Sequence, residues 1–134
     1  MMSVYEPFGN FISGAWVGGP DGDAVVISPV TEQPVGAYRP ATVADTNAAI
    51  AAAERALPAL VSLGGWERAT RLHAIADEMA RREAEGARMI SVETGKPIAQ
   101  SRREWALAVD QFRWYAEEAR RITGRIVPSR VPGG

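Results

Sequence analysis

The last helical pattern in the chain is long for a protein of 134 residues. Apolar residues recur at spacings of three, four and seven through residues 98–122, after Pro97 and before Gly124. About 26 residues at a rise of 1.5 Å form a helix of roughly 39 Å. A compact chain of this size has a radius of gyration of about 14 Å, or a diameter of roughly 36 Å. The helix therefore spans the whole molecule, and we expect it to lie against something larger.

Aromatic side chains follow this helix, and the rest of the chain has little with which to cover them. Trp105, Phe112 and Tyr115 lie on or beside the apolar stripe, with Trp114 next to them. Alanine supplies 23 of the 62 apolar residues of the chain, and each methyl group buries little area. The core is therefore shallow, and we expect the chain by itself to fold with little stability to spare.

Residues 1–40 follow a strand pattern. Phe11-Ile12 and Trp16-Val17 flank Ser13-Gly14-Ala15, an arrangement typical of a tight hairpin. Further strands are predicted over Ala24–Ile27 and Pro34–Arg39. The glycines between these strands do not open a helix, so they do not form a dinucleotide-binding fingerprint.

Residues 41–124 follow a helical pattern, and residues 125–134 are predicted to be an extended tail. A capping box, Thr42 with Asp45, predicts the first helix start, and Pro58 should end or kink that helix. A second helix is expected from Trp66 and a third over Glu83–Thr94, before the long fourth one. The chain is thus predicted to be a single α+β unit, with short antiparallel strands followed by about four helices.

Composition excludes several classes of protein. A formal net charge of −1 and a pI near 5.9 argue against a nucleic-acid binder. The absence of cysteine excludes a disulfide scaffold, a thiolate metal site and a cysteine nucleophile within these residues. No stretch approaches the roughly 20 apolar residues of a membrane span, and residues 1–7 lack the features of a signal peptide. We therefore expect no membrane partner and a cytoplasmic location.

Polar side chains in the helical region reveal no catalytic constellation. His73 is the one histidine, beside an apolar stripe, and is interpreted as a boundary residue. The acidic pairs Asp77-Glu78 and Glu117-Glu118 have arginines three or four residues away, which predicts ordinary ion pairs on the helix surface.

The segment Val92-Glu93-Thr94-Gly95-Lys96-Pro97 is a helix stop followed at once by a helix start. Together with Phe112–Ala116 and the glycine at 124, it resembles the N-terminal region of the aldehyde dehydrogenase superfamily, with its E-T-G-K-P string and aromatic segment. Residues 11–17 (FISGAWV) resemble the family's I-x-G-x-W-V opening, and residues 27–31 (ISPVT) resemble its I-N-P-A-T turn. The residues from 114 to 118 (WYAEE) look most like the succinate-semialdehyde dehydrogenase branch.

The resemblance implies that residues 1–134 are one N-terminal segment of the larger α/β aldehyde dehydrogenase fold. Such enzymes oxidise an aldehyde to an acid with NAD or NADP, using a cysteine nucleophile, an asparagine in the oxyanion site and a glutamate that activates water. In the family all of these lie beyond the region matched here. We therefore expect a truncated, inactive chain with no catalytic or cofactor-binding residue of its own.

Four residues acquire candidate roles from the resemblance. Arg103 and Leu107 correspond to positions that face the substrate tunnel, where an arginine would favour an anionic aldehyde such as a semialdehyde acid. The alternative is that Arg103 is turned to solvent. Glu93, through its side chain, and Ile27, through its carbonyl, correspond to ligands of a monovalent cation; the alternative is that Glu93 caps or pairs locally.

Three hypotheses follow for the chain as a whole. The favoured one is that the chain is the N-terminal piece of an NAD(P)-dependent aldehyde dehydrogenase. The partner of this piece is then the remainder of the fold, and the complete enzyme is expected to form a homo-oligomer. The second is a stand-alone helical interaction module that docks its long aromatic helix on a partner. The third is a non-catalytic relic that associates with a full-length paralogue.

Overall fold

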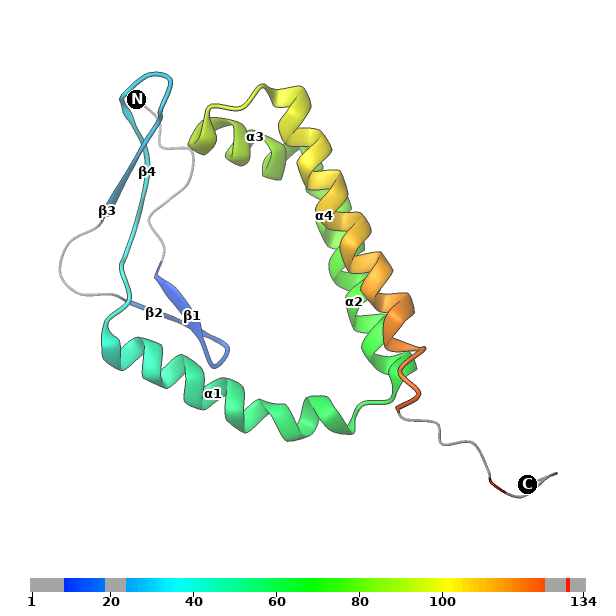
Figure 1. Cartoon of the computed structure of the whole chain (residues 1–134). Helices are drawn as coiled ribbons and strands as arrows, with labels where there is room; N and C mark the ends of the chain where they lie inside the picture. Colours follow the sequence, from blue (N-terminus) through cyan, green and yellow to red (C-terminus); the bar gives the residue numbers. More distant parts are fainter. Residues whose placement is uncertain (1–8, 19–23, 125–129, 131–134) are drawn as a thin grey trace.

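The computed structural model describes residues 9–18, 24–124 and 130. It contains two antiparallel strand pairs followed by four helices, as predicted (Figure 1). The tail predicted over residues 125–134 lies, apart from residue 130, outside the described residues. The elements are β1 (Asn10–Ile12), β2 (Ala15–Val17), β3 (Ala24–Ile27), β4 (Pro34–Tyr38), α1 (Val43–Ser62), α2 (Gly65–Arg81), α3 (Glu83–Thr94) and α4 (Ile98–Ala119).

The first hairpin forms where the sequence predicts it. Strands β1 and β2 pair with Phe11 opposite Trp16, and these two rings meet edge to face with centroids 5.2 Å apart. Ser13 and Gly14 both have positive φ angles, 55° and 84°, as a two-residue hairpin turn requires.

The second hairpin, β3–β4, turns around the buried side chain of Ser28. Its hydroxyl oxygen accepts hydrogen bonds from the backbone N–H groups of Val30 and Thr31, each at 3.3 Å. The Ser28 N–H donates to the Gln33 carbonyl at 2.9 Å, and Glu32 adopts a φ of 55° to close the turn. A short polar side chain at position 28 therefore organises the whole turn.

Helix α1 begins at the predicted capping box but does not end at Pro58. The Thr42 hydroxyl accepts a hydrogen bond from the Asp45 N–H at 3.1 Å, and the Asp45 carboxylate accepts one from the Thr42 N–H at 2.9 Å. The helix then continues through Pro58 to Ser62. Because α1 contains no buried residue, the hydrogen bond that the proline removes needs no replacement inside a core.

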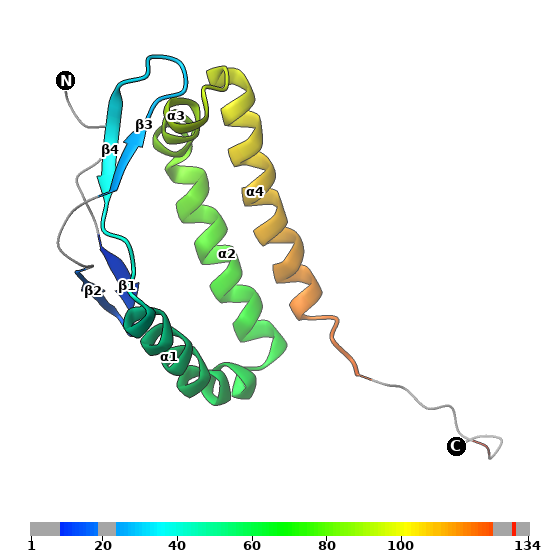
Figure 2. The same ribbon diagram turned by 60° about the vertical axis from the view of Figure 1, so that its left-hand side comes forward.

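Helices α2 and α4 form the core of the described chain, lying side by side in Figures 1 and 2. Ala69, Ala116 and Ala119 are buried between them, with Leu72 packed against the cluster. An added Cβ on Gly65 would lie 2.5 Å from the Ala119 carbonyl oxygen, so the two backbones approach closely at this end. We call the contact between α2 and α4 the alanine seam.

Helix α4 ends earlier than the apolar pattern predicts. It stops at Ala119 rather than near Ile122, because the N–H groups of Arg120 and Arg121 donate to carbonyls three residues back, at 3.2 and 2.9 Å. This tightens the last turn and closes the helix. Its 22 residues span about 33 Å.

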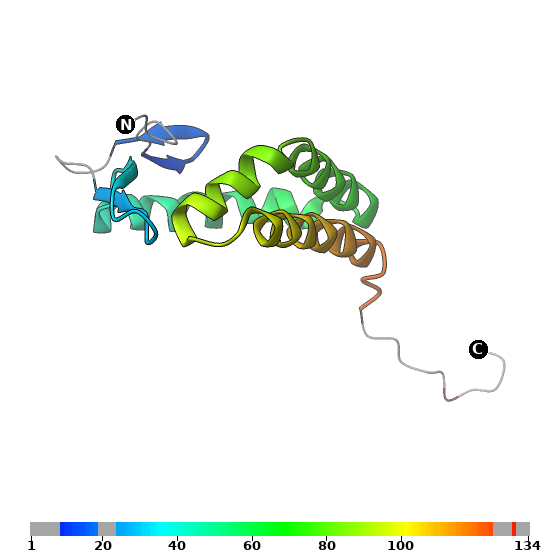
Figure 3. The ribbon, with the colours of Figure 1, turned by 90° about the horizontal axis from the view of Figure 1, so that it is seen from above.

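The two halves of the chain form an open frame (Figures 1 and 3). The strand pairs lie with α1 on one side, and α2, α3 and α4 lie on the other. Large apolar side chains remain exposed on both sides, among them Ile50, Leu57, Leu107, Trp114 and Tyr115. No helix among the described residues has the length and apolar character to span a membrane.

Candidate functional site

The turn between α3 and α4 is built by a left-handed glycine and two hydroxyl side chains. Gly95 has a φ of 74° and donates its N–H to the Ser91 carbonyl at 3.0 Å, which closes α3 as the sequence predicts. The Ser91 hydroxyl donates to the Lys96 carbonyl at 2.6 Å, and the Thr94 hydroxyl donates to the Ile90 carbonyl at 2.6 Å. The backbone of Lys96 is therefore held against the last turn of α3.

This turn also meets the β3–β4 turn from the other half of the chain. An added Cβ on Gly95 would lie 3.0 Å from Val30 Cγ2 and 3.2 Å from Pro29 Cγ. The contact brings together the ends of α3 and β3, which carry Glu93 and Ile27 respectively. Both side chains are exposed.

A cation site at this junction needs more ligands than those two residues supply. The described residues contain no group of three or more His, Cys, Asp or Glu side chains placed to hold a metal ion. Hard cations are bound by several oxygen ligands, so Glu93 and Ile27 would have to be completed by groups from elsewhere.

Arg103 and Leu107 lie one turn apart on α4, and both are exposed, Leu107 by 56%. The residues three and four positions from Arg103 are Ala99, Gln100, Ala106 and Leu107, none of them charged. Within the described part of the chain, the guanidinium makes no ion pair and no hydrogen bond. Arg103 therefore presents an uncompensated positive charge next to an apolar side chain.

Six other helical arginines are paired, as the acidic pairs in the sequence predict, whereas Arg55, Arg68, Arg88 and Arg102 resemble Arg103 in having no ion pair among the described residues. Carboxylates three or four residues away, or on a facing helix, pair with Arg71, Arg81, Arg82, Arg113, Arg120 and Arg121. The interpretation of Asp77-Glu78 and Glu117-Glu118 as surface ion-pair residues is confirmed.

Sequence reasoning missed one charged contact at this site. The Lys96 ammonium forms an ion pair with the Glu104 carboxylate, eight residues along the chain and one residue after Arg103. The signal that could have indicated it is that Lys96 is the single lysine of the chain, at the start of the helix that carries Glu104.

The sequence profile of the aldehyde dehydrogenase family matches residues 16–134, which is most of the chain. The chain belongs to the aldehyde dehydrogenase family. The match includes the β3–β4 turn, all four helices and the junction at Gly95, so these elements are those of the family's N-terminal region.

Characterised aldehyde dehydrogenases resemble the chain over nearly its full length. It is 36% identical to a glutarate-semialdehyde dehydrogenase of Pseudomonas aeruginosa over 123 residues. These residues make up 91% of this chain and 26% of that enzyme. The chain is 36% identical over 118 residues to the NADP-dependent succinate-semialdehyde dehydrogenase of Escherichia coli, over 87% of this chain and 24% of that enzyme. The chain therefore spans about a quarter of the length of the curated relatives it matches.

Solved aldehyde dehydrogenase structures contain the same arrangement of strands and helices. Aldehyde dehydrogenase 21 of Physcomitrella patens, in complex with the reaction product succinate, matches with a TM-score of 0.86 at 30% identity, over 96% of this chain and 27% of that one. An NADP-dependent enzyme of E. coli matches with a TM-score of 0.83 at 34% identity, over 90% of this chain and 25% of that one. The expected fold, part of the larger aldehyde dehydrogenase fold, is confirmed.

This aldehyde dehydrogenase region also contains a cross-helix polar contact at the alanine seam. His73 Nε2 lies 2.9 Å from Glu117 Oε1, and the His73 side chain is 34% exposed, which confirms its position at the boundary of the core. The hydrogen bond from His73 lowers the pKa of the Glu117 carboxyl, assisted by the nearby charges of Arg120 and Arg121.

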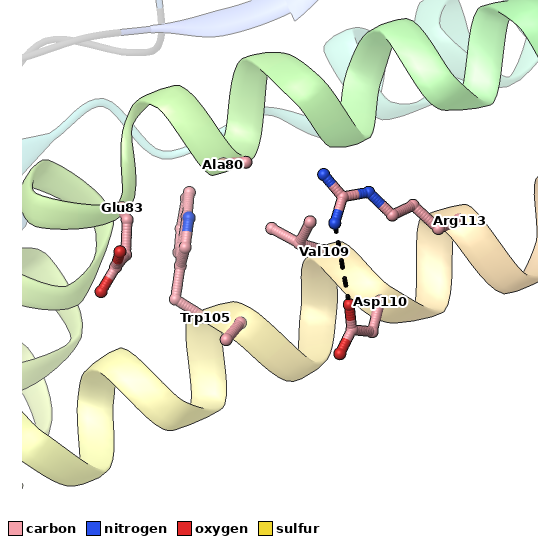
Figure 4. Close-up of a pocket in the computed structure, with 7 residues that line it drawn as sticks. Ala80, Glu83, Trp105, Val109, Asp110 and Arg113 are labelled. Carbon is pink, nitrogen blue, oxygen red and sulfur yellow. Dashed lines mark ion pairs between the residues drawn. The ribbon is translucent and has the colours of Figure 1, made fainter.

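A cleft of about 160 Å³ opens between α2 and α4 at the other end of the seam (Figure 4). The Trp105 indole N–H donates to the Met79 carbonyl at 2.7 Å and fixes the ring at one wall. Arg113, at the other wall, is already paired with Asp77 at 3.5 Å and Asp110 at 4.0 Å. Glu83 also lines the cleft and makes no ion pair with another described residue, so the uncompensated charge of the cleft is negative, in contrast to that around Arg103.

Proposed function

We propose that this chain forms the N-terminal quarter of an NAD- or NADP-dependent aldehyde dehydrogenase that oxidises a semialdehyde acid to a dicarboxylic acid. The observation that carries the proposal is the unpaired guanidinium of Arg103 on α4. Two of the similar enzymes are named for substrates of this class, glutarate semialdehyde and succinate semialdehyde.

The role of Arg103 follows from its chemistry. A guanidinium binds a carboxylate through two parallel N–H···O bonds, and such charge-assisted bonds are stronger than neutral ones. Leu107, one turn further along α4, would contact the methylene chain between the carboxylate and the aldehyde. The two residues thus recognise the end of the substrate that does not react.

The reaction itself depends on groups that these residues do not supply. The chain contains no cysteine, and its described glycines lie in hairpins, helix junctions or helix interiors rather than in a strand-to-helix phosphate loop. NAD or NADP, when bound, accepts the hydride from the aldehyde carbon. We accordingly assign the cofactor, the nucleophile and the oligomer contacts to the remainder of the fold.

The junction at Gly95 supports a secondary proposal for Glu93 and Ile27. The Glu93 carboxylate and the Ile27 carbonyl would contribute two oxygen ligands to a monovalent cation, with the others coming from the rest of the fold. Changing Glu93 to Gln in the complete enzyme should then raise the potassium concentration needed for full thermal stability. An unchanged dependence would contradict this assignment.

The main proposal is tested in a complete enzyme. Residues 1–134 can replace the matching quarter of the E. coli succinate-semialdehyde dehydrogenase. In that chimera Arg103→Ala should raise KM for succinate semialdehyde about tenfold or more, because a charge-assisted bond contributes roughly 1.5–3 kcal/mol. An unchanged KM would exclude Arg103 from substrate binding. The 134-residue chain alone should produce no NADH or NADPH from any aldehyde.

The exposed apolar face of α1 favours a second candidate function. Ile50, Leu57, Leu60 and Val61 remain at least half exposed on a helix without a buried residue, which suits a non-catalytic module that docks on a partner, including a full-length paralogue. The coding sequence downstream of Gly134 separates the two functions. A continuation with a proline-tryptophan-asparagine segment and a later cysteine supports the enzyme, whereas unrelated sequence supports the module.

A further inference from the structure

The face of α4 around Arg103 carries two opposite charges on consecutive residues. Arg103 and Glu104 are neighbours in sequence, and Leu107 lies four positions from one and three from the other, so it sits one turn above both. A carboxylate substrate bound by Arg103 would therefore lie close to a second carboxylate, that of Glu104. Unless that charge is compensated, it repels the substrate carboxylate.

The structure shows what compensates it. The Lys96 ammonium pairs with the Glu104 carboxylate, and the Lys96 backbone is held at both of its polar groups. Its carbonyl accepts the Ser91 hydroxyl at 2.6 Å, and its N–H donates to the Thr94 hydroxyl at 3.4 Å. The lysine thus projects from a turn fixed by α3, while its partner projects from α4.

We infer that Lys96 is a positioning residue for anionic substrates, because it holds and neutralises Glu104 and so leaves the Arg103 charge free to bind a substrate carboxylate. The inference rests on the proposed function. With Lys96 present, the charges of Lys96, Arg102, Arg103 and Glu104 sum to +2. Without it they sum to +1, and the Glu104 carboxylate loses its partner.

The charge count predicts a change in selectivity rather than a general loss of activity. A unit charge several ångströms from an anion at the protein surface changes its binding by about threefold to tenfold. A neutral aldehyde has no carboxylate and should not sense the change. If the Lys96–Glu104 pair only stabilised the α3–α4 turn, its loss would instead change KM for both aldehydes alike.

The test uses the chimera described above, with succinate semialdehyde and propanal as paired substrates. Lys96→Met, which keeps the length of the side chain, should raise KM for succinate semialdehyde about threefold or more and leave KM for propanal unchanged. Lys96→Arg should restore the wild-type values. Lys96→Met combined with Glu104→Gln should also restore them, since the repelling carboxylate is then gone.

The outcomes separate this inference from the proposal beneath it. If Arg103→Ala leaves KM unchanged, the role of Arg103 is wrong and the inference falls with it. If Arg103→Ala raises KM but Lys96→Met does not, or if Lys96→Met raises KM for both aldehydes equally, only the inference is overturned.

A second measurement uses the 134-residue chain and covers the case of an inactive chimera. Reductive methylation with ¹³C-formaldehyde labels the single lysine and the α-amino group. The lysine's dimethylammonium resonance, assigned by its absence from the Lys96→Met variant, reports the contact directly. The resonance should shift and sharpen in the Glu104→Gln variant, because the side chain is released. A resonance unaffected by that substitution would show that the pair does not form, and would overturn the inference.

Discussion

The alanine seam and helix α1 use the same residue in opposite ways. In the seam, Ala69, Ala76 and Ala116 are fully buried, and the small side chain lets two helices approach closely. In α1, which is richer in alanine than either helix of the seam, no residue is buried. The seam therefore satisfies its packing within this chain, whereas α1 depends on contacts that the described residues do not supply. Alanine content alone does not distinguish a tight helix pair from an unpartnered helix.

The difference in packing between the seam and α1 is tested most strongly by enlarging one alanine in each region. Ala116→Leu should lower the free energy of unfolding by about 3 kcal/mol, because the fully buried site has no room for the added atoms. The matched change in α1, Ala56→Leu, lies on an exposed position and should alter it by less than about 0.5 kcal/mol. Urea unfolding followed by circular dichroism measures both. Equal effects would mean that α1 is packed as tightly as the seam.

A smaller loss is expected where α3 meets α4. A Cβ on Gly86 would lie 2.4 Å from the Trp105 ring, whose N–H is bonded to the Met79 carbonyl. Gly86→Ala should therefore cost about 1.5 kcal/mol net, even though alanine favours the helix by about 1 kcal/mol. The same urea titration checks this value, and the tryptophan emission should shift as Trp105 moves. A stabilised variant would contradict the packing described here.

Removing the cap of α1 tests how independent that helix is. Thr42→Ala deletes the hydroxyl that accepts the Asp45 N–H and should cost about 1 kcal/mol. Because α1 does not share the alanine seam, the loss should remain local. Hydrogen exchange should accelerate for the amides of α1 and stay unchanged for those of α2. Faster exchange in both helices would show that they unfold together.

The smallest effect expected is that of pH. The hydrogen bond from His73 lowers the pKa of Glu117 from its ordinary value of 4.5, so its contribution to stability is present above that pH and is lost as the pH falls through the lowered value. Backbone hydrogen bonding to Thr42 lowers the pKa of Asp45 in the same direction. Stability should therefore decline as the pH falls below the ordinary pKa values of these two carboxyls. Thermal unfolding of Glu117→Gln should show a weaker decline, and an unaltered one would exclude Glu117 as a contributor.

The sequence predicted most of the fold because its boundary signals are local. The capping box at Thr42, the positive-φ glycine at 95 and the hairpin at Ser13-Gly14 each act on their own neighbours. One of the two outcomes predicted for Pro58, an end of the helix, is wrong, because α1 continues to Ser62. The predicted end of α4 is also wrong, because hydrogen bonding rather than hydrophobic spacing closes that helix.

The candidate site was predictable only in part. The family resemblance implied candidate roles for Arg103 and Leu107, which stay predictions, and the uncharged residues around Arg103 were already visible in the sequence. The pairing of Lys96 with Glu104 was not predictable from helical spacing, because Lys96 precedes the helix and the two residues are eight positions apart.

Gly95 has a mechanical consequence beyond ending a helix. Its backbone reverses the chain between α3 and α4, and its missing side chain lets that reversal rest against Val30 of the strand half. The two halves of the frame are thus connected by the polypeptide between α1 and α2, and they also meet through a non-covalent packing contact at Gly95. A side chain there would strain the turn at its positive φ and press on Val30 and Pro29 at once, so a single substitution would weaken both the turn and the contact between the two halves.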